Sequence, residues 1–268
     1  MLLTDLPVVR NPIGKDIPED KLVKVLLINP NASESMTLNA MKMVEGSLPV
    51  DAIVYGYTGP KGITPSTIEG HLDGVLSSAA VFKDVYPLMS QVDTALVACF
   101  SEHPLTNCLR EEFDIPVCGI FEAGCYSARL IGGRFGVVAT VYRSEIRHAD
   151  SIKNLGIDKF CVGVLSTGLK VSELETKPRN EVLGKMENIA QELVGRGADA
   201  LILGCCGMSD MKNAVESSVK DKKVMVIDGV VAGVNLLCGL VRSGLKTSKR
   251  GLFASSKDAR VSRGQEYL

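Results

Sequence analysis

The chain carries a cysteine at the same point of two similar stretches. Asp93-Thr-Ala-Leu-Val-Ala-Cys99 and Asp199-Ala-Leu-Ile-Leu-Gly-Cys205 each open on an aspartate and reach a cysteine six positions later through an apolar run. Upstream, residues 24–29 parallel residues 135–140. This pattern indicates a duplicated α/β unit. Two opposed thiols could remove a proton from one face of a carbon and return one to the other face.

The position of each cysteine also predicts its acidity. Each follows an expected strand and precedes an expected helix, which starts near Pro104 in the first half and near Ser209 in the second. Backbone N–H groups at a helix start stabilise a thiolate, so we expect the pKa of Cys99 and Cys205 to fall from about 8.5 toward neutrality. A thiolate and a thiol would then act as a coupled base and acid. The alternative is that both cysteines only pack at strand ends, or, in an oxidising compartment, form a disulfide.

Other residues that follow expected strands could hold a substrate. Asn29 and Ser33 lie in the turn-forming stretch Asn-Pro-Asn-Ala-Ser, which could cradle a small anion or an imide, although Ser33 also suits a helix N-cap. Thr140 is the counterpart of Asn29 in the second half. His103 could pair with Cys99, but neighbours in sequence are seldom catalytic partners.

Short apolar runs alternate with amphipathic stretches along the chain. Continuous rather than alternating apolar runs predict strands of a parallel sheet that is covered on both faces. We expect strands at 24–28, 51–55, 94–98, 116–119, 135–139, 160–164, 200–204 and 224–227, and helices near 34–46, 68–89, 104–112, 144–154, 179–196, 208–219 and 230–244. The alternation predicts an α/β fold whose ligand lies beyond the carboxyl ends of the strands.

The repeat also suggests a division into domains. We expect an N-terminal extension at 1–22, a first α/β domain from 23–119 plus 229–245, a second at 120–228, and a basic tail at 246–268 that wraps the surface or is disordered.

Composition excludes several classes of partner and site. A formal net charge of −1 and the absence of Trp give no support for a nucleic-acid partner or a membrane surface. No apolar run spans a bilayer and the N-terminus lacks the pattern of a secretory signal, so we expect a cytoplasmic protein. The eight cysteines and three histidines show no zinc-ligand spacing, and a vicinal Cys205–Cys206 redox or metal pair is a weaker interpretation, so we expect no metal.

The motifs resemble the aspartate/glutamate/hydantoin racemase superfamily, and within it the fungal members of the hydantoin and allantoin racemase branch. The resemblance runs from Lys24 to about Leu240. It rests on five stretches, which are Ile28-Asn-Pro-Asn-Ala-Ser-Glu-Ser-Met-Thr37, Pro65-Ser-Thr-Ile-Glu-Gly70, Ala98-Cys-Phe-Ser-Glu-His-Pro-Leu105, Gly119-Ile-Phe-Glu-Ala123 and Leu203-Gly-Cys-Cys-Gly-Met208. It implies two similar parallel-sheet domains related by a pseudo-twofold axis, with the active site in the cleft between them. It also implies racemisation without a cofactor by Cys99 and Cys205, in a homo-oligomer.

Departures from the amino-acid racemases of the superfamily narrow the expected substrate. Those enzymes follow their cysteines with Asn-Thr and with Thr, whereas this chain has Phe100-Ser101 and Cys206-Gly207-Met208. These less polar residues suit a flat, uncharged hydantoin ring, whose C5 carbanion is an enolate. Asn29, Ser33, Thr140 and backbone N–H groups after the cysteines could bind its carbonyls. By family analogy we expect a hydantoin racemase acting on allantoin, in purine catabolism.

Three alternatives stay open. An amino-acid racemase of the Asp or Glu type would need added carboxylate and ammonium recognition. A cysteine-dependent decarboxylase or isomerase could use the same fold, since fold alone does not fix the reaction. A small-molecule binding protein would show ligand stabilisation without turnover and thiols of ordinary reactivity.

Overall fold

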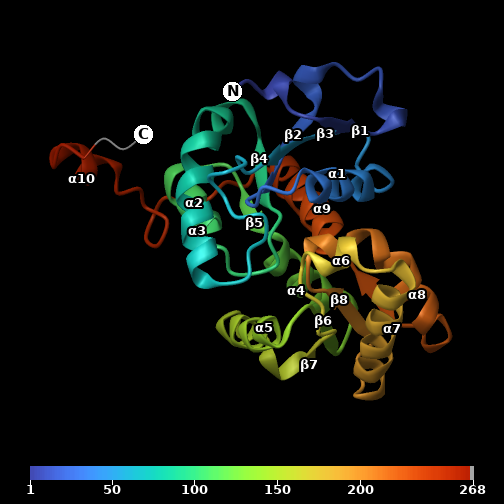
Figure 1. Ribbon diagram of the computed structural model, residues 1–268. Coiled ribbons are helices and arrows are strands. Elements are labelled where there is room, and N and C mark those ends of the chain that lie inside the picture. The colour runs from blue at the N-terminus through green and yellow to red at the C-terminus, as the bar shows by residue number, and fades with distance from the viewer. Residues whose placement is uncertain (266–268) are drawn as a thin grey trace. The chain divides into compact units, whose positions relative to one another are not determined.

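The computed structural model describes residues 1–265 (Figure 1). By their contacts these residues form two compact units. The first unit comprises Met1–Ala98, His103–Gly119 and the chain from Val234 onward, and the second comprises Cys99–Glu102 and Ile120–Gly233. The short segment that carries Cys99 therefore belongs to the second unit by its contacts, although the strand before it belongs to the first.

The first unit is built on a five-stranded sheet of order β1-β3-β2-β4-β5. Its strands are β1 (Val8–Arg10), β2 (Val23–Asn29), β3 (Ala52–Thr58), β4 (Thr94–Val97) and β5 (Val117–Gly119). All neighbours pair in parallel except β1, which pairs antiparallel with β3. Six of the seven residues of β2 are buried, as expected for a central parallel strand whose two faces are both covered.

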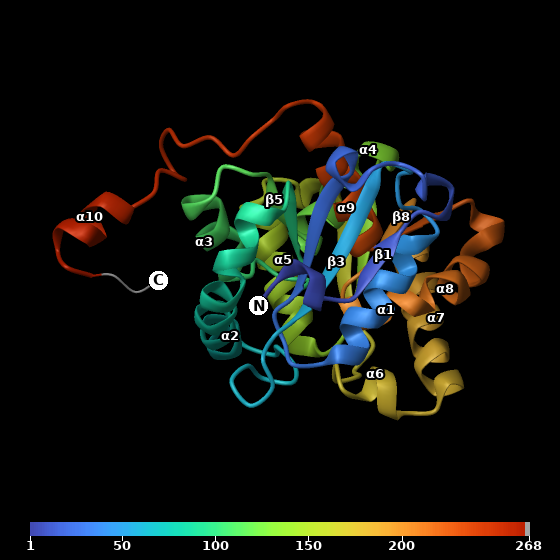
Figure 2. The same ribbon diagram turned by 90° about the horizontal axis from the view of Figure 1, so that it is seen from above.

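Two helices of the first unit begin where the sequence supplies a side-chain cap. In α1 (Glu34–Glu45) the Ser33 hydroxyl accepts the N–H of Met36, and in α3 (Pro104–Glu112) the His103 ring accepts the N–H of Leu105. Helix α2 (His71–Val85) packs against α3, and the two lie side by side in both ribbon views (Figures 1 and 2).

The second unit has a four-stranded, fully parallel sheet of order β7-β6-β8-β9. Its strands are β6 (Phe135–Ala139), β7 (Cys161–Ser166), β8 (Ala200–Leu203) and β9 (Met225–Ile227). Its helices are α4 (Ile120–Ile131), α5 (Tyr142–Asn154), α6 (Glu173–Thr176), α7 (Arg179–Gly195) and α8 (Lys212–Val219), and α9 (Gly229–Arg242) starts in this unit and ends in the first. Met186 and Leu193 of α7 are fully buried against Leu201 of β8.

The strands and most helices expected from the sequence are confirmed to within a few residues. One strand and three α-helices were missed, namely the edge strand β1 within the N-terminal extension and helices α4, α6 and α10 (Lys257–Ser262). The expected start of the helix at 208–219 was wrong. A 3-10 helix spans Cys206–Met211, and α8 begins only at Lys212. The expected helix at 68–89 likewise ends at Val85 and continues as the 3-10 helix Tyr86–Gln91.

Between α9 and Gln265 the chain contacts the C-terminal end of α3, so the described part of the basic tail lies along the surface. The Lys249 ammonium donates to the carbonyls of Glu111 and Phe113 at 3.1 and 2.6 Å, which suits the negative end of a helix. Arg260 then pairs with Glu112 at 2.7 Å, three residues into α10 (Lys257–Ser262). The predicted tail residues 266–268 lie outside the described residues.

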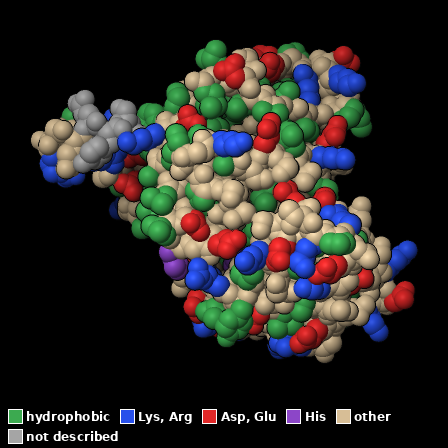
Figure 3. All heavy atoms as spheres, in the orientation of Figure 1, with side chains coloured by type: hydrophobic (Ala, Val, Ile, Leu, Met, Phe, Trp, Pro, Cys, Tyr) green, Lys and Arg blue, Asp and Glu red, His purple; other side chains and the backbone are tan. Residues whose placement is uncertain are grey.

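The surface offers no membrane-spanning element in the part of the chain that is described. No helix within residues 1–265 combines the length and the apolar character needed to cross a bilayer. On the face shown in Figure 3, cationic and anionic side chains are interspersed rather than gathered by sign.

Candidate active site

The two predicted catalytic cysteines stand at equivalent points of the two sheets. Cys99 comes two residues after β4 ends and Cys205 two residues after β8 ends. The Cys99–Glu102 segment is tied to the second unit by Asn154, whose side-chain amide donates to Glu102 at 3.0 Å. Both cysteines are therefore held by the contacts of a single unit, and both are half-buried and form no disulfide.

The two thiols interact electrostatically. Charge on Cys99 raises the pKa of Cys205, and it also contributes to the raised pKa of Cys206. Groups that interact in this way titrate as a pair, so removing a proton from one thiol makes the other harder to ionise.

The predicted lowering of both thiol pKa values is wrong. Burial raises the pKa of Cys99, and it raises that of Cys205 to about 12. The expected stabilisation by backbone N–H groups exists only at Cys205, where the Gly207 N–H lowers the pKa of the thiol, and burial outweighs it. Helix α3, which was expected to supply these groups to Cys99, has His103 as its N-cap, four residues further on.

Polar groups around Cys99 partly oppose the rise in its thiol pKa that burial causes. The Ser101 hydroxyl lies 3.3 Å from the Cys99 sulfur, and this hydrogen bond lowers the pKa of the thiol. The positive charge of Arg147, on α5, lowers it further. A thiolate at Cys99 would therefore have a hydrogen-bond donor and a cation for support.

The charged side chain near Cys205 is an anion, in contrast to the cation near Cys99. Besides Cys99, the carboxylate of Glu175 in α6 raises the pKa of Cys205. Cys206 is buried, and burial together with charge on Cys205 and Asp228 raises its pKa well above the ordinary thiol value. The vicinal pair thus consists of the half-buried Cys205 and the buried Cys206, whose thiol stays protonated.

Phe100 anchors the Cys99 segment in an aromatic cluster. Its ring meets Phe121 of α4 edge-on at 5.3 Å between centroids, and it meets the imidazole of His148 of α5 at 5.1 Å. Phe100 and His148 are both nearly fully buried. Such edge-to-face contacts stabilise one orientation of the segment that carries Cys99.

The remaining predicted substrate-binding residues fall into both units. In the second unit, the Thr140 hydroxyl lies 3.0 Å from that of Ser144, and Met208 is fully buried in the core. In the first unit, the buried Asn29 amide donates to Asn31 and to the Ser33 carbonyl, each at 2.9 Å, so it holds the loop between β2 and α1. A role for these residues in binding substrate stays a prediction.

Three charged or titratable neighbours of the cysteines were missed from the sequence, namely Arg147, His148 and Glu175. They lie on helices distant from either cysteine in the chain. Only the tertiary fold brings the charges of Arg147 and Glu175 to bear on the thiols and the His148 ring against Phe100. His148 carried a weak signal, because the chain has only three histidines.

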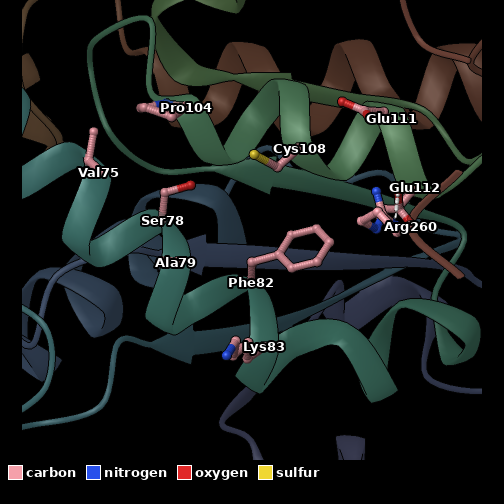
Figure 4. A pocket seen from close by; sticks show the side chains of 10 residues that line it. All are labelled: Val75, Ser78, Ala79, Phe82, Lys83, Pro104, Cys108, Glu111, Glu112 and Arg260. Carbon is pink, nitrogen blue, oxygen red and sulfur yellow. Dashed lines mark hydrogen bonds and ion pairs between the residues drawn. The ribbon is translucent and has the colours of Figure 1, made fainter. Parts of the chain in front are cut away.

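A separate cavity of about 480 Å³ lies in the first unit between α2 and α3 (Figure 4). It is lined by Val75, Ser78, Ala79, Phe82, Lys83, Pro104, Cys108, Glu111, Glu112 and Arg260, with the ion pair of Glu112 and Arg260 at one end. It contains none of the predicted site residues. Within residues 1–265, no cluster of His, Cys, Asp and Glu side chains is arranged to hold a metal ion.

The chain is similar to known proteins along most of its length. An uncharacterized Schizosaccharomyces pombe protein is 38% identical over 87% of this chain and 98% of its own length. A hydantoin racemase of Rhizobium meliloti is 32% identical over 85% of this chain and 92% of its own. The solved structure of an allantoin racemase from Klebsiella pneumoniae matches with a TM-score of 0.79 and 29% identity, over 87% of this chain and 93% of its own. The family model described as Asp/Glu/Hydantoin racemase matches residues 25–237, and the chain belongs to that family.

Proposed function

We propose that this protein is a cofactor-independent racemase of 5-substituted hydantoins, with allantoin as its substrate, and that Cys99 and Cys205 are its acid–base pair. The observation that carries the proposal is the electrostatic coupling of the thiols of two half-buried cysteines, each placed just beyond the carboxyl end of a parallel strand. Membership of the racemase family and likeness to hydantoin and allantoin racemases support the substrate class.

The proposed reaction moves one proton off C5 and another onto its opposite face. The thiolate of one cysteine takes the C5 proton, and the electron pair is delocalised into the adjacent ring carbonyl as an enolate. The thiol of the other cysteine then donates its proton to the opposite face of C5. The first sulfur ends as a thiol and the second as a thiolate, and exchange with solvent restores the starting state. A positioned acid and base each contribute typically about 10²- to 10⁴-fold to such a step.

Cys99 is the better resting base of the two. Ser101 and Arg147 both favour its thiolate, whereas Glu175 disfavours a thiolate at Cys205. In the proposed resting state Cys99 therefore ionises first, and Cys205 remains the thiol. Because burial raises the pKa of both, activity should rise with pH above neutrality until the first thiol is ionised.

Polarimetry with each enantiomer of allantoin tests the proposal. The purified protein should bring the optical rotation of both enantiomers to zero, and Cys99→Ser and Cys205→Ser should each slow this loss of rotation by about 10²- to 10⁴-fold. Cys108→Ser is the matched control, because it replaces an exposed thiol of the first unit. Racemisation at the full rate by either mutant would refute the cysteine pair. Unchanged rotation with the intact protein would refute allantoin as the substrate, and aspartate and glutamate enantiomers would be assayed next.

A further inference from the structure

His148 contacts both chain segments that carry the active-site cysteines. Its ring lies edge-on to Phe100, the residue after Cys99, with 5.1 Å between centroids and an interplanar angle of 83°. The same imidazole is hydrogen-bonded to the backbone of Gly204, the residue before Cys205. All of these groups belong to the second unit.

The hydrogen bond can be assigned to particular atoms. The bond to Gly204 raises the pKa of His148, which means that the imidazole donates and the Gly204 carbonyl accepts. The Gly204 N–H is already used, since it donates to the Val138 carbonyl at 2.8 Å. Nδ1 of His148 is buried and has no partner within the described chain, so Nε2 is the donor.

Burial keeps this arrangement neutral and rigid. His148 is only 5% exposed, with Phe100 on one side and Phe121 at 6.2 Å on another. Burial and the nearby charge of Arg147 lower the pKa of His148 to about 4, so at neutral pH the ring holds one proton, on Nε2. A neutral ring with one fixed donor has one orientation that satisfies both contacts.

We propose that His148 is a positioning residue that fixes the Cys99 segment against the Cys205 segment, through its ring on Phe100 and its hydrogen bond to Gly204. This inference rests on the proposed function only in taking the two cysteines as a working pair. His148 contacts the residue after Cys99 and the residue before Cys205. Its proposed role is to fix the positions of the two thiols relative to each other, so that one deprotonates and the other reprotonates the same carbon.

The first test needs no substrate. Cys99 alkylation by iodoacetamide is followed against pH by peptide mass spectrometry, with and without Cys205→Ser, in a Cys108→Ser background. In the parent protein, removal of Cys205 should change the pH profile of Cys99 because the thiols are coupled. In His148→Phe, which keeps an aromatic ring but loses the donor, the same removal should change the profile much less. An equal change in both backgrounds would overturn the proposal.

The second test separates positioning from simple loss of folded protein. In heavy water, the ratio of deuterium uptake by unreacted allantoin to inversion should rise several-fold in His148→Phe, because a displaced acid reprotonates the carbanion less efficiently. A variant that is merely less folded loses uptake and inversion in proportion, and an unchanged ratio would overturn the proposal.

His148→Gln provides a second variant that retains a donor but lacks the ring. It should show an intermediate ratio and an intermediate coupling, and values equal to those of the parent would contradict a role for the ring. If the parent protein racemises no hydantoin, the proposed function fails, while the alkylation experiment still decides whether His148 couples the two thiols.

Discussion

Cys99 and Cys205 occupy the same topological position after two parallel strands, yet their charged side-chain neighbours Arg147 and Glu175 shift the thiol pKa in opposite directions. Cys99 has a hydroxyl at 3.3 Å and a cation that lower the pKa of its thiol, whereas Cys205 has the Gly207 N–H and a carboxylate that act against each other. The repeated sequence accounts for the matching positions of the thiols. The surrounding helices make them unequal, and in the proposed mechanism this inequality makes Cys99 the readier base and Cys205 the readier acid.

The largest expected effect comes from removing either thiol. Cys99→Ser and Cys205→Ser should each reduce the racemisation rate by about 10²- to 10⁴-fold, because a serine hydroxyl is a far weaker acid than a thiol. Initial rates from both enantiomers by polarimetry measure this loss. If either mutant kept more than a tenth of the parent rate, the pairing of Cys99 with Cys205 would be contradicted. Cys108→Ser should keep the parent rate.

His148, which joins the two cysteine segments, should give stability a pH dependence of its own. Its pKa is lowered from 6.5 to about 4 in the folded protein, so the unfolded chain binds more protons between these values and stability falls as pH falls. The free energy of unfolding should therefore drop by about 2 to 3 kcal/mol from this residue between pH 7 and pH 4.5.

Urea unfolding of the parent and of His148→Phe at both pH values isolates this contribution. Carboxylates titrate in both proteins, so the difference between the two pH dependences belongs to His148. The parent should lose more stability than the variant on acidification. Parallel losses would mean that His148 is not held neutral, and the link between the cysteine segments would lose its support.

Replacing the charged neighbours by neutral residues should shift the pKa of the two thiols in opposite directions. Arg147→Met removes a cation that lowers the pKa of Cys99, so alkylation of Cys99 near neutral pH should slow several-fold. Glu175→Gln removes an anion that raises the pKa of Cys205, so alkylation of Cys205 should become faster. Alkylation–pH profiles of the individual peptides report both changes, and shifts of the same sign would contradict the proposed asymmetry.

The smallest change is expected from the hydroxyl beside Cys99. Ser101→Ala removes a single neutral hydrogen bond to the sulfur, so alkylation of Cys99 should slow about two- to fivefold while that of Cys205 stays nearly constant. Ser144→Ala removes a comparable hydroxyl from α5 and provides the matched control. Equal effects of both variants on Cys99 would show that Ser101 has no specific influence on this thiol.

The fold class and the equivalent positions of Cys99 and Cys205 after two strands could be predicted from the sequence, because both depend on local patterns. Apolar runs such as the one before Cys99 mark buried strands, and the repeated spacing marks equivalent positions. The pKa of the two thiols could not be predicted in this way, because burial is a tertiary property and here it outweighs the local N–H groups. Helix α4 was missed because it follows β5 at once, without a turn-forming residue other than Gly119 to signal its start.

Local sequence patterns also do not predict that the Cys99 segment belongs to the second unit. Residues 99–102 follow a strand of the first unit, but the aromatic contact of Phe100 and the hydrogen bond of Glu102 tie them to α5. The partners, His148 and Asn154, lie about fifty residues further along the chain. Nothing in the spacing of the sequence identifies such pairs.

Deuterium labelling during the first few per cent of conversion tests the acid–base pair most directly. One enantiomer of allantoin is mixed with the intact protein in heavy water, and C5 deuterium is measured separately in the product and in the unreacted substrate. The account predicts deuterium in the product enantiomer and retained hydrogen in the substrate, because one cysteine removes the proton and the other delivers a solvent-derived one. Deuterium entering the substrate as fast as the product forms would mean that a single group serves both faces, and it would contradict the pairing of Cys99 with Cys205.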